Sequence, residues 1–161
     1  MGKSFKIELS LERFEQLEEL PHQVQNLFKA AVEARESAYA PYSNFHVGAA
    51  LLLANGEIIK GNNQENAAYP SGLCAERTAV YYAGANYPDV EILMMAISAK
   101  AKSKDTPVPI PPCGACRQAL AEYEVKQEKP IAVYFRGGSG AILKSDSVEN
   151  LLPLLFTQKF L

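Results

Sequence analysis

Three cysteines occupy two short segments whose spacing could hold one metal ion. Cys113 and Cys116 form a C-x-x-C pair after two prolines, and Cys74 lies earlier in the chain. Zinc favours four tetrahedral ligands, and a catalytic zinc site takes three from the protein and leaves the fourth for water or substrate. A site made only of cysteines must stop at three here, because the chain has no fourth. The spacing therefore predicts one zinc ion per chain, with an open position.

A carboxylate stands close to the first of these cysteines. Glu76 follows Cys74 by two residues, which keeps the two side chains within one helical turn of each other. Bound zinc lowers the pKa of water from about 15.7 towards roughly 7, and a nearby carboxylate can accept the released proton and deliver it elsewhere. We therefore predict that Glu76 carries protons in a hydrolytic reaction and is not itself a metal ligand.

Three thiolates would leave the zinc site with a net negative charge, and the sequence offers two ways to offset it. Both cysteine segments follow prolines, which suit the first turn of a helix. The positive end of a helix dipole favours the thiolate form of cysteine. Arg77 and Arg117 directly follow the two motifs, and we expect one or both to donate hydrogen bonds to sulfur.

Other interpretations of the cysteines remain open. The C-x-x-C pair could be a redox dithiol, although this leaves Cys74 without a role. A structural zinc site could use His22 or His46 as a fourth ligand, although neither histidine has finger-like spacing to a cysteine and Glu76 would be idle. A disulfide framework is disfavoured, because the number of cysteines is odd and the chain is not small and secreted.

Composition indicates one globular domain over residues 1–161, of which residues 1–20 form an extension without an assigned role. The net charge of −2 provides no strong field for nucleic acid, so we expect no nucleic-acid partner. No apolar run approaches the length of a membrane span, and we expect no membrane association. Unpaired cysteines make the cytoplasm the expected compartment.

Hydrophobic periodicity predicts an α/β fold. Residues 5–11 suggest a short strand or an extended arm, and residues 11–20 have a helical period. We expect helices over residues 21–38, 74–85 and 113–122, strands over residues 47–54, 57–61, 92–99, 131–135 and 141–143, and a last helix capped by Ser147. This order predicts a three-layer α/β/α sandwich around a mixed five-stranded sheet. Both cysteine segments then lie at the end of the sheet where sites form.

Four motifs together resemble the cytidine deaminases of the small, homotetrameric, three-cysteine type. They are A-P-Y-S-N-F-H-V-G-A-A at residues 40–50, N-Q-E-N-A-A-Y-P at 63–70, C-A-E-R-T-A at 74–79 and P-C-G-A-C-R-Q at 112–118. The resemblance covers residues 21–156. His46 replaces the family's usual proline, and residues 1–20 exceed a typical family N-terminus.

The resemblance implies roles for residues around the cysteines. Asn63 and Glu65 are expected to bind the ribose hydroxyls, and alternate strand positions would point both side chains the same way. The alternative is a strand-end turn in which both make only local hydrogen bonds. Phe45 is expected to stack on the pyrimidine, unless it is ordinary core. The backbone N–H of Ala75 is expected to contact the base.

The resemblance also implies a homotetramer with active sites shared between subunits. Tyr69 and Phe156 are expected to serve a neighbouring subunit's site, with core packing as the alternative. The expected reaction is hydrolytic deamination of cytidine to uridine in pyrimidine salvage, and deoxycytidine should also fit. Glu76 would pass a proton from water to N3 of the base and then to the departing amino group.

Two rival functions are retained. Blasticidin-S deaminases share the three-cysteine motif and the tetramer, although the intact pair of Asn63 and Glu65 favours a nucleoside. A non-catalytic, zinc-stabilised interaction module would have no need of Glu76, which makes that residue the discriminating feature. A polynucleotide-editing deaminase would need a basic channel and base-stacking aromatic residues, and the net charge argues against it.

Overall fold

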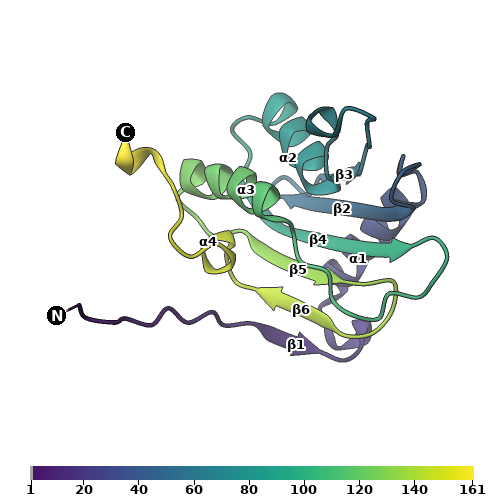
Figure 1. The fold of residues 1–161 in the computed structure, drawn as a ribbon, viewed down its shortest axis with the longest axis horizontal. Helices are drawn as coiled ribbons and strands as arrows, with labels where there is room; N and C mark the ends of the chain where they lie inside the picture. Colours follow the sequence, from purple (N-terminus) through teal and green to yellow (C-terminus); the bar gives the residue numbers. More distant parts are fainter. Residues whose placement is uncertain (1) are drawn as a thin grey trace.

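A computed structural model describes residues 2–161 of the chain, and Met1 lies outside the described residues. Six strands form one sheet in the order β1-β6-β5-β4-β2-β3 (Figure 1). The strands are β1 (Glu12–Phe14), β2 (Phe45–Leu53), β3 (Ile58–Asn62), β4 (Ile92–Ala101), β5 (Ala132–Arg136) and β6 (Ile142–Ser145). The helices are α1 (His22–Glu36), α2 (Ala75–Asn86), α3 (Gly114–Gln127) and α4 (Val148–Leu151).

The sheet is mixed, as the sequence predicts. Strands β4 and β5 run parallel, and every other neighbouring pair is antiparallel. The α/β architecture is confirmed, but the sheet has six strands and the prediction of five is wrong.

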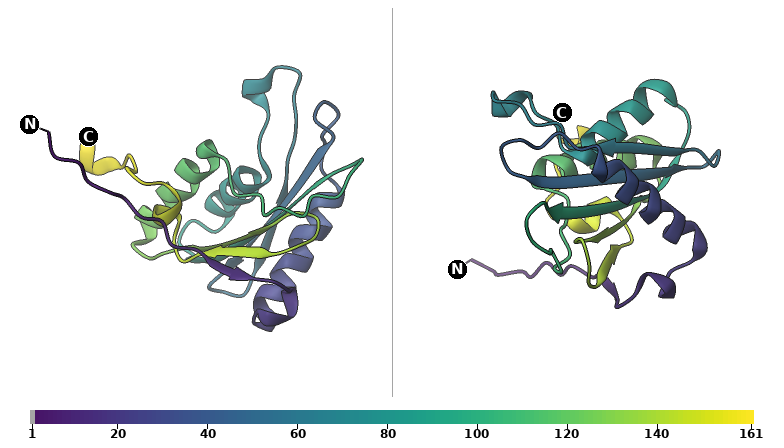
Figure 2. Two further views of the ribbon diagram at one scale, coloured as in Figure 1. Left: turned by 60° about the horizontal axis from the view of Figure 1, so that its bottom comes forward. Right: turned by 90° about the vertical axis from the view of Figure 1, so that its right-hand side faces the viewer.

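The additional strand, β1, comes from the N-terminal extension. Its three residues pair antiparallel with β6, and Lys144 Nζ lies 2.6 Å from Glu12 Oε1 across the pair. The helical period of residues 11–20 does not correspond to an α-helix, because that segment holds β1 and one 3-10 turn over Leu17–Glu19. Pairing with a strand distant in sequence has overridden a weak local pattern. Residues 2–11 continue outward as an extended arm, and both termini lie at the same end of the molecule (Figure 2).

Helices cover both faces of the sheet (Figures 1 and 2). Helix α1 packs on one face over Ala50, Leu52 and Ala96, while α2, α3 and α4 cover the other face over residues such as Ala49 and Leu51. Successive residues of β2 thus contribute to opposite cores, as the two-residue period of a strand requires.

Two glycines bring helices unusually close to the sheet. A Cβ atom at Gly48 would lie 2.0 Å from the carbonyl oxygen of Ala31 in α1. A Cβ atom at Gly61 would lie 2.5 Å from the carbonyl oxygen of Ala75 in α2. These two contacts therefore fix α1 and α2 against opposite faces of the sheet.

The helix boundaries follow from local chemistry. Ser147 caps α4, because its side chain accepts a hydrogen bond from the Asn150 N–H. Helix α3 continues past the predicted end at residue 122, as far as Gln127, and ends at Glu128 in a left-handed conformation with φ of 54°. Among the residues described, no helix has both the length and the apolar character needed to cross a bilayer.

Candidate metal centre and active site

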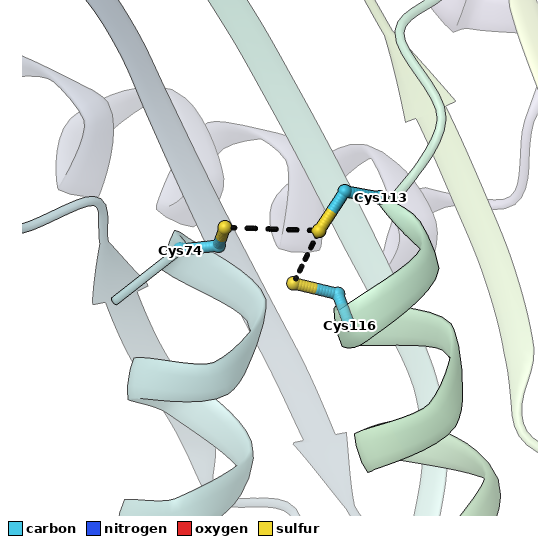
Figure 3. A group of neighbouring side chains, drawn as sticks. All are labelled: Cys74, Cys113 and Cys116. Atoms are coloured by element: carbon cyan, nitrogen blue, oxygen red, sulfur yellow. Dashed lines mark hydrogen bonds between the residues drawn. The ribbon is translucent and has the colours of Figure 1, made fainter. Parts of the chain in front are cut away.

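The three cysteines meet where α2 and α3 begin (Figure 3). Cys74 is the residue before α2, Cys113 is the residue before α3, and Cys116 lies in the first turn of α3. The Sγ atoms of Cys74 and Cys113 are 3.8 Å apart, and those of Cys113 and Cys116 are 3.4 Å apart. All three sulfur atoms lie within 4.8 Å of one another.

This geometry fits a zinc ion. Two sulfur ligands at about 2.3 Å from a tetrahedral zinc would be about 3.8 Å apart, which is close to the observed separations. Cys116 is fully buried whereas Cys113 is exposed, so the cluster is open on one side. The three thiols therefore supply the ligands that a catalytic zinc site takes from protein.

Arg77 contributes positive charge to the sulfur cluster. Its Nη2 atom donates to Cys74 Sγ over 3.6 Å. The neighbouring Cys116 thiol, followed by the Arg77 guanidinium, lowers the pKa of Cys74 to about 5. A thiolate is the form that binds a metal, so Arg77 favours the ligand state of Cys74.

Arg117 has a different role from the one expected. Its Nε donates to the Pro112 carbonyl oxygen over 2.8 Å, and its Nη1 donates to the Leu151 carbonyl oxygen over 3.0 Å. The guanidinium thus connects the segment before Cys113 to the end of α4. The expectation of an arginine bonded to sulfur therefore applies to Arg77, while Arg117 holds the backbone around the site.

Glu76 is a buried carboxyl group next to the cluster. Its side chain lies in the first turn of α2 and the residue is only 4% exposed. Burial raises the pKa of Glu76 to about 7. A group with a pKa near neutrality can both accept and release a proton, which is the property that the sequence assigns to this position.

The segment after β3 is tied directly to the first cysteine. The backbones of Gln64 and Leu73 exchange two hydrogen bonds, each of 2.9 Å, immediately before Cys74. The Asn63 side chain continues the ladder of β2, because its Oδ1 accepts from the Val47 N–H over 2.8 Å and its Nδ2 donates to the Phe45 carbonyl oxygen over 2.9 Å. The expected ribose segment and the sulfur cluster are thus neighbours.

Glu65 is held by the loop before β2. Its carboxylate accepts hydrogen bonds from the N–H groups of Tyr42 and Ser43 and from the Ser43 hydroxyl. The Ser43 hydroxyl is the main cause that lowers the pKa of Glu65. The Asn63 and Glu65 side chains therefore hydrogen-bond to residues 42–47, which lie 16 to 23 positions away in the sequence, and these bonds fix both polar groups.

The remaining expected residues occupy different surroundings. Ala75 is fully buried as the first residue of α2, and Phe45 begins β2. Tyr69 is 77% exposed and its ring contacts Tyr42 edge-on at 6.4 Å between centroids. Phe156 is 58% exposed. Within the described residues, Tyr69 and Phe156 therefore lie on the surface and not in the core.

Two contributors escaped the sequence analysis. Ser43 lies inside the motif at residues 40–50, yet only the structure pairs its hydroxyl with Glu65. Gln118 lies inside the motif at residues 112–118, and its Nε2 donates to the Phe156 carbonyl oxygen over 3.0 Å. In both cases the motif marked the position but did not identify the partner, which is distant in sequence.

Comparisons with known proteins agree with this geometry. Residues 21–129 match the family described as the cytidine and deoxycytidylate deaminase zinc-binding region. A cytidine deaminase of Halalkalibacterium halodurans is 47% identical over 133 residues, which cover 83% of this chain and 93% of that protein. A cytidine deaminase of Sporosarcina psychrophila is 41% identical over 136 residues, covering 84% of this chain and 93% of that protein.

A solved structure extends the likeness to three dimensions. The crystal structure of cytidine deaminase from Burkholderia pseudomallei superposes with a TM-score of 0.72 and 40% sequence identity. The aligned region covers 85% of this chain and 100% of the chain from Burkholderia pseudomallei. Fold, sulfur cluster and sequence similarity agree, and the chain belongs to the cytidine and deoxycytidylate deaminase family.

Proposed function

We propose that the protein catalyses the zinc-dependent hydrolytic deamination of cytidine to uridine with release of ammonia, in pyrimidine salvage, and that deoxycytidine is also a substrate. The observation that carries this proposal is the buried carboxyl group of Glu76 beside three clustered cysteine sulfurs. The names of the similar proteins specify the substrate class.

The residues of the chain divide the work of this reaction. Bound zinc supplies Lewis acidity that makes water a nucleophile near neutral pH. Glu76 accepts one proton from water and places it on N3 of the base as the water oxygen bonds to C4. It then takes the second proton from the new C4 hydroxyl group and delivers it to the amino nitrogen, so that the C4–N bond breaks and ammonia leaves. The buried environment that raises the pKa of Glu76 suits both directions of transfer.

Binding of the nucleoside is assigned to the residues beside the cluster. Phe45 stacks on the pyrimidine, and the Ala75 N–H at the start of α2 contacts the base. Asn63 and Glu65 bind the ribose hydroxyls. Support comes from the hydrogen bonds that hold Asn63 against β2 and Glu65 against Ser43, since fixed polar groups lose little freedom when a ligand binds.

We infer further that the protein works as a homotetramer with shared active sites. Tyr69 and Phe156 expose most of their surface, and aromatic residues are enriched in subunit interfaces. A neighbouring subunit that receives them would also exclude water from the open side of the sulfur cluster. We place the enzyme in the cytoplasm, in keeping with its three free cysteines.

One assay separates the possible activities. Purified protein is mixed with cytidine, deoxycytidine or blasticidin S, and loss of the cytosine absorbance band is followed together with ammonia release. We expect rapid turnover of both nucleosides and loss of activity when a chelator removes zinc. Preference for blasticidin S would reassign the substrate. Absence of turnover on every substrate with zinc bound would support an interaction module, for which the buried Glu76 has no use.

A further inference from the structure

Basic side chains gather on the face of the sheet that carries α1, opposite the cysteine cluster. They lie where β2 begins and where β4 and β5 end. The members of this basic cluster are Arg35, His46, Lys100, Lys102 and Arg136. No step of the proposed deamination uses these residues.

Strand register brings the cluster together. Ser98 is paired with Gly48 on one side and with Arg136 on the other, so the three residues share one row of the sheet. His46 and Lys100 form the next row. The contact between α1 and Gly48 lets Arg35 reach this row, where its Nη1 donates to Ser98 Oγ over 2.9 Å.

The cluster holds more positive than negative charge. Glu36 accepts from Arg35 Nη2 over 3.0 Å, but the Glu36 side chain is 69% exposed, and the Arg35 side chain only 9%. Asp105 lies near Lys100 but is hydrogen-bonded to the Ser139 hydroxyl. Four arginine and lysine side chains therefore face three carboxylates. Glu36 is largely solvated, Asp105 is engaged elsewhere, and Glu18 acts on Arg136.

Arg136 shows the imbalance most directly. Its Nη2 donates to the Gly138 carbonyl oxygen over a long 3.3 Å, and its Nε is buried without a hydrogen-bond partner among the described residues. Burial, and after it the nearby Arg35 cation, lowers the pKa of Arg136. A buried N–H donor without a partner is costly, and an anion nearby would offset the positive charge of this partly buried guanidinium.

A cavity of suitable size opens at this place. It has a volume of about 230 Å³ and is lined by Arg35, Glu36, His46, Lys100, Ala101 and Lys102. This is below the range of about 300–1,000 Å³ that is usual for drug-sized ligands. A small anion with several oxygen atoms would fit it better, because arginine binds such groups through paired N–H donors.

We propose that this cavity binds a phosphate group, either as inorganic phosphate or as the phosphate of a nucleotide. Arg35 lines it from α1, and Lys100 and Lys102 approach from the end of β4 and the loop after it. Arg136 lies next to Arg35 on β5, outside the lining, and adds positive charge there. The site lies across the sheet from the cysteines, so it does not depend on the proposed catalytic function and can be tested in the absence of substrate.

The test measures binding of inorganic phosphate to the full-length zinc-loaded protein by calorimetry and by thermal shift. Sodium chloride at equal ionic strength separates specific binding from a general salt effect. We expect saturable binding with phosphate and none with chloride. Adenosine 5′-monophosphate in parallel distinguishes the sources: tighter binding than phosphate indicates a nucleotide, and weaker binding indicates the free ion.

Variants locate the site. Arg136→Gln removes a positive charge next to Arg35 and should weaken phosphate binding about tenfold. Lys100→Gln, at an exposed position, should also weaken binding and covers the case in which Arg136→Gln does not fold. Lys129→Gln is the matched control, because this exposed lysine pairs with Glu91 far from the cavity, and it should leave binding unchanged.

Two results would overturn the proposal. One is phosphate binding that is absent or non-saturable in the parent protein, or that is as strong in both variants as in the parent. The other is an Arg136→Gln protein that changes its assembly state while the parent shows no response to phosphate. In that case the cluster meets a carboxylate of another subunit.

Discussion

Glu76 is the single residue on which the proposed chemistry depends most. Glutamine at this position keeps the size of the side chain but cannot carry a proton. We expect the Glu76→Gln protein to retain zinc and to turn over cytidine at least about a hundredfold more slowly, the lower range for loss of an acid–base group. Metal analysis and steady-state kinetics on the same preparation measure both quantities.

The matched control for this change is Glu57→Gln, at an exposed position in the turn between β2 and β3. It removes one carboxylate from the chain far from the cysteines and should leave kcat at the parent value. Turnover of Glu76→Gln near the parent rate would mean that another group moves the proton.

Arg77 acts on the same centre through its contact with Cys74. Arg77→Ala removes the donor that lies 3.6 Å from the sulfur. We expect zinc affinity or turnover to fall about 10–100-fold, the usual effect of losing a group that hydrogen-bonds a metal ligand, with a smaller effect on the melting temperature. Zinc loss to a competing chelator, followed over time, measures the affinity directly.

Arg77→Lys separates charge from geometry in this prediction. Lysine keeps the positive charge but lacks the planar set of donors, so it should recover only part of the zinc affinity. Equal zinc retention in the parent and in Arg77→Ala would show that the arginine does not support the metal ligands.

At the scale of secondary-structure elements, one buried carboxylate joins α3, the residue before β5, and α4. Glu124 Oε2 accepts from the N–H groups of Ile131 and Val148, each over 2.7 Å, and its Oε1 accepts from the Glu149 N–H over 2.8 Å. The carboxylate thereby stabilises the N-terminus of α4. It also sets the position of the C-terminal segment that follows this helix.

Glu124→Gln tests this connection. An amide offers one acceptor oxygen, so its NH₂ group would face at least one backbone N–H. We expect a loss of about 1–3 kcal/mol in the free energy of unfolding, measured by denaturant titration. Glu122→Gln, on the exposed side of the same helix, should have little effect. Equal stability of the two variants would show that the three hydrogen bonds contribute nothing.

The elements differ in how well the sequence predicts them. Helix α1 and the hairpin of β2 and β3 follow from local periodicity and from the Asn55-Gly56 turn. Strand β1 could not be predicted in this way, because it is stabilised by pairing with β6 at the other end of the chain. The same distinction holds at the site, where spacing identifies the cysteines but not the contact of Ser43 with Glu65.

At the scale of the whole molecule, several apolar side chains remain exposed at the chain ends. Phe5 is 82% exposed in the N-terminal arm, and Leu154 and Phe160 are 83% and 71% exposed in the C-terminal segment. Large apolar side chains left exposed are typical of proteins that associate. We expect light scattering at micromolar concentration to give about four times the 17.6 kDa mass of one chain. A fully active monomer would contradict the shared-site proposal but not the deaminase assignment.

Sharing of sites between subunits can be tested by mixing two variants that we expect to be inactive when each is assayed alone. Glu76→Gln lacks the proton carrier, and Phe156→Ala lacks the exposed ring that we assign to a neighbouring site. If Phe156 acts across the interface, some sites in a mixed tetramer combine an intact Glu76 of one subunit with an intact Phe156 of another. We therefore expect activity to rise when the two variants are dissociated, mixed and reassembled.

The controls for this experiment are each variant dissociated and reassembled alone, which should stay inactive. Both proteins carry the same zinc ligands. A gain in activity therefore reports only whether Phe156 completes the site of another subunit. If Phe156 instead completes the site of its own subunit, every site in the mixture lacks either the ring or the carboxylate, and activity stays at the level of the separate variants. Restored activity is therefore possible only when the C-terminal segment, which Arg117 and Gln118 hold at the surface, reaches into another subunit.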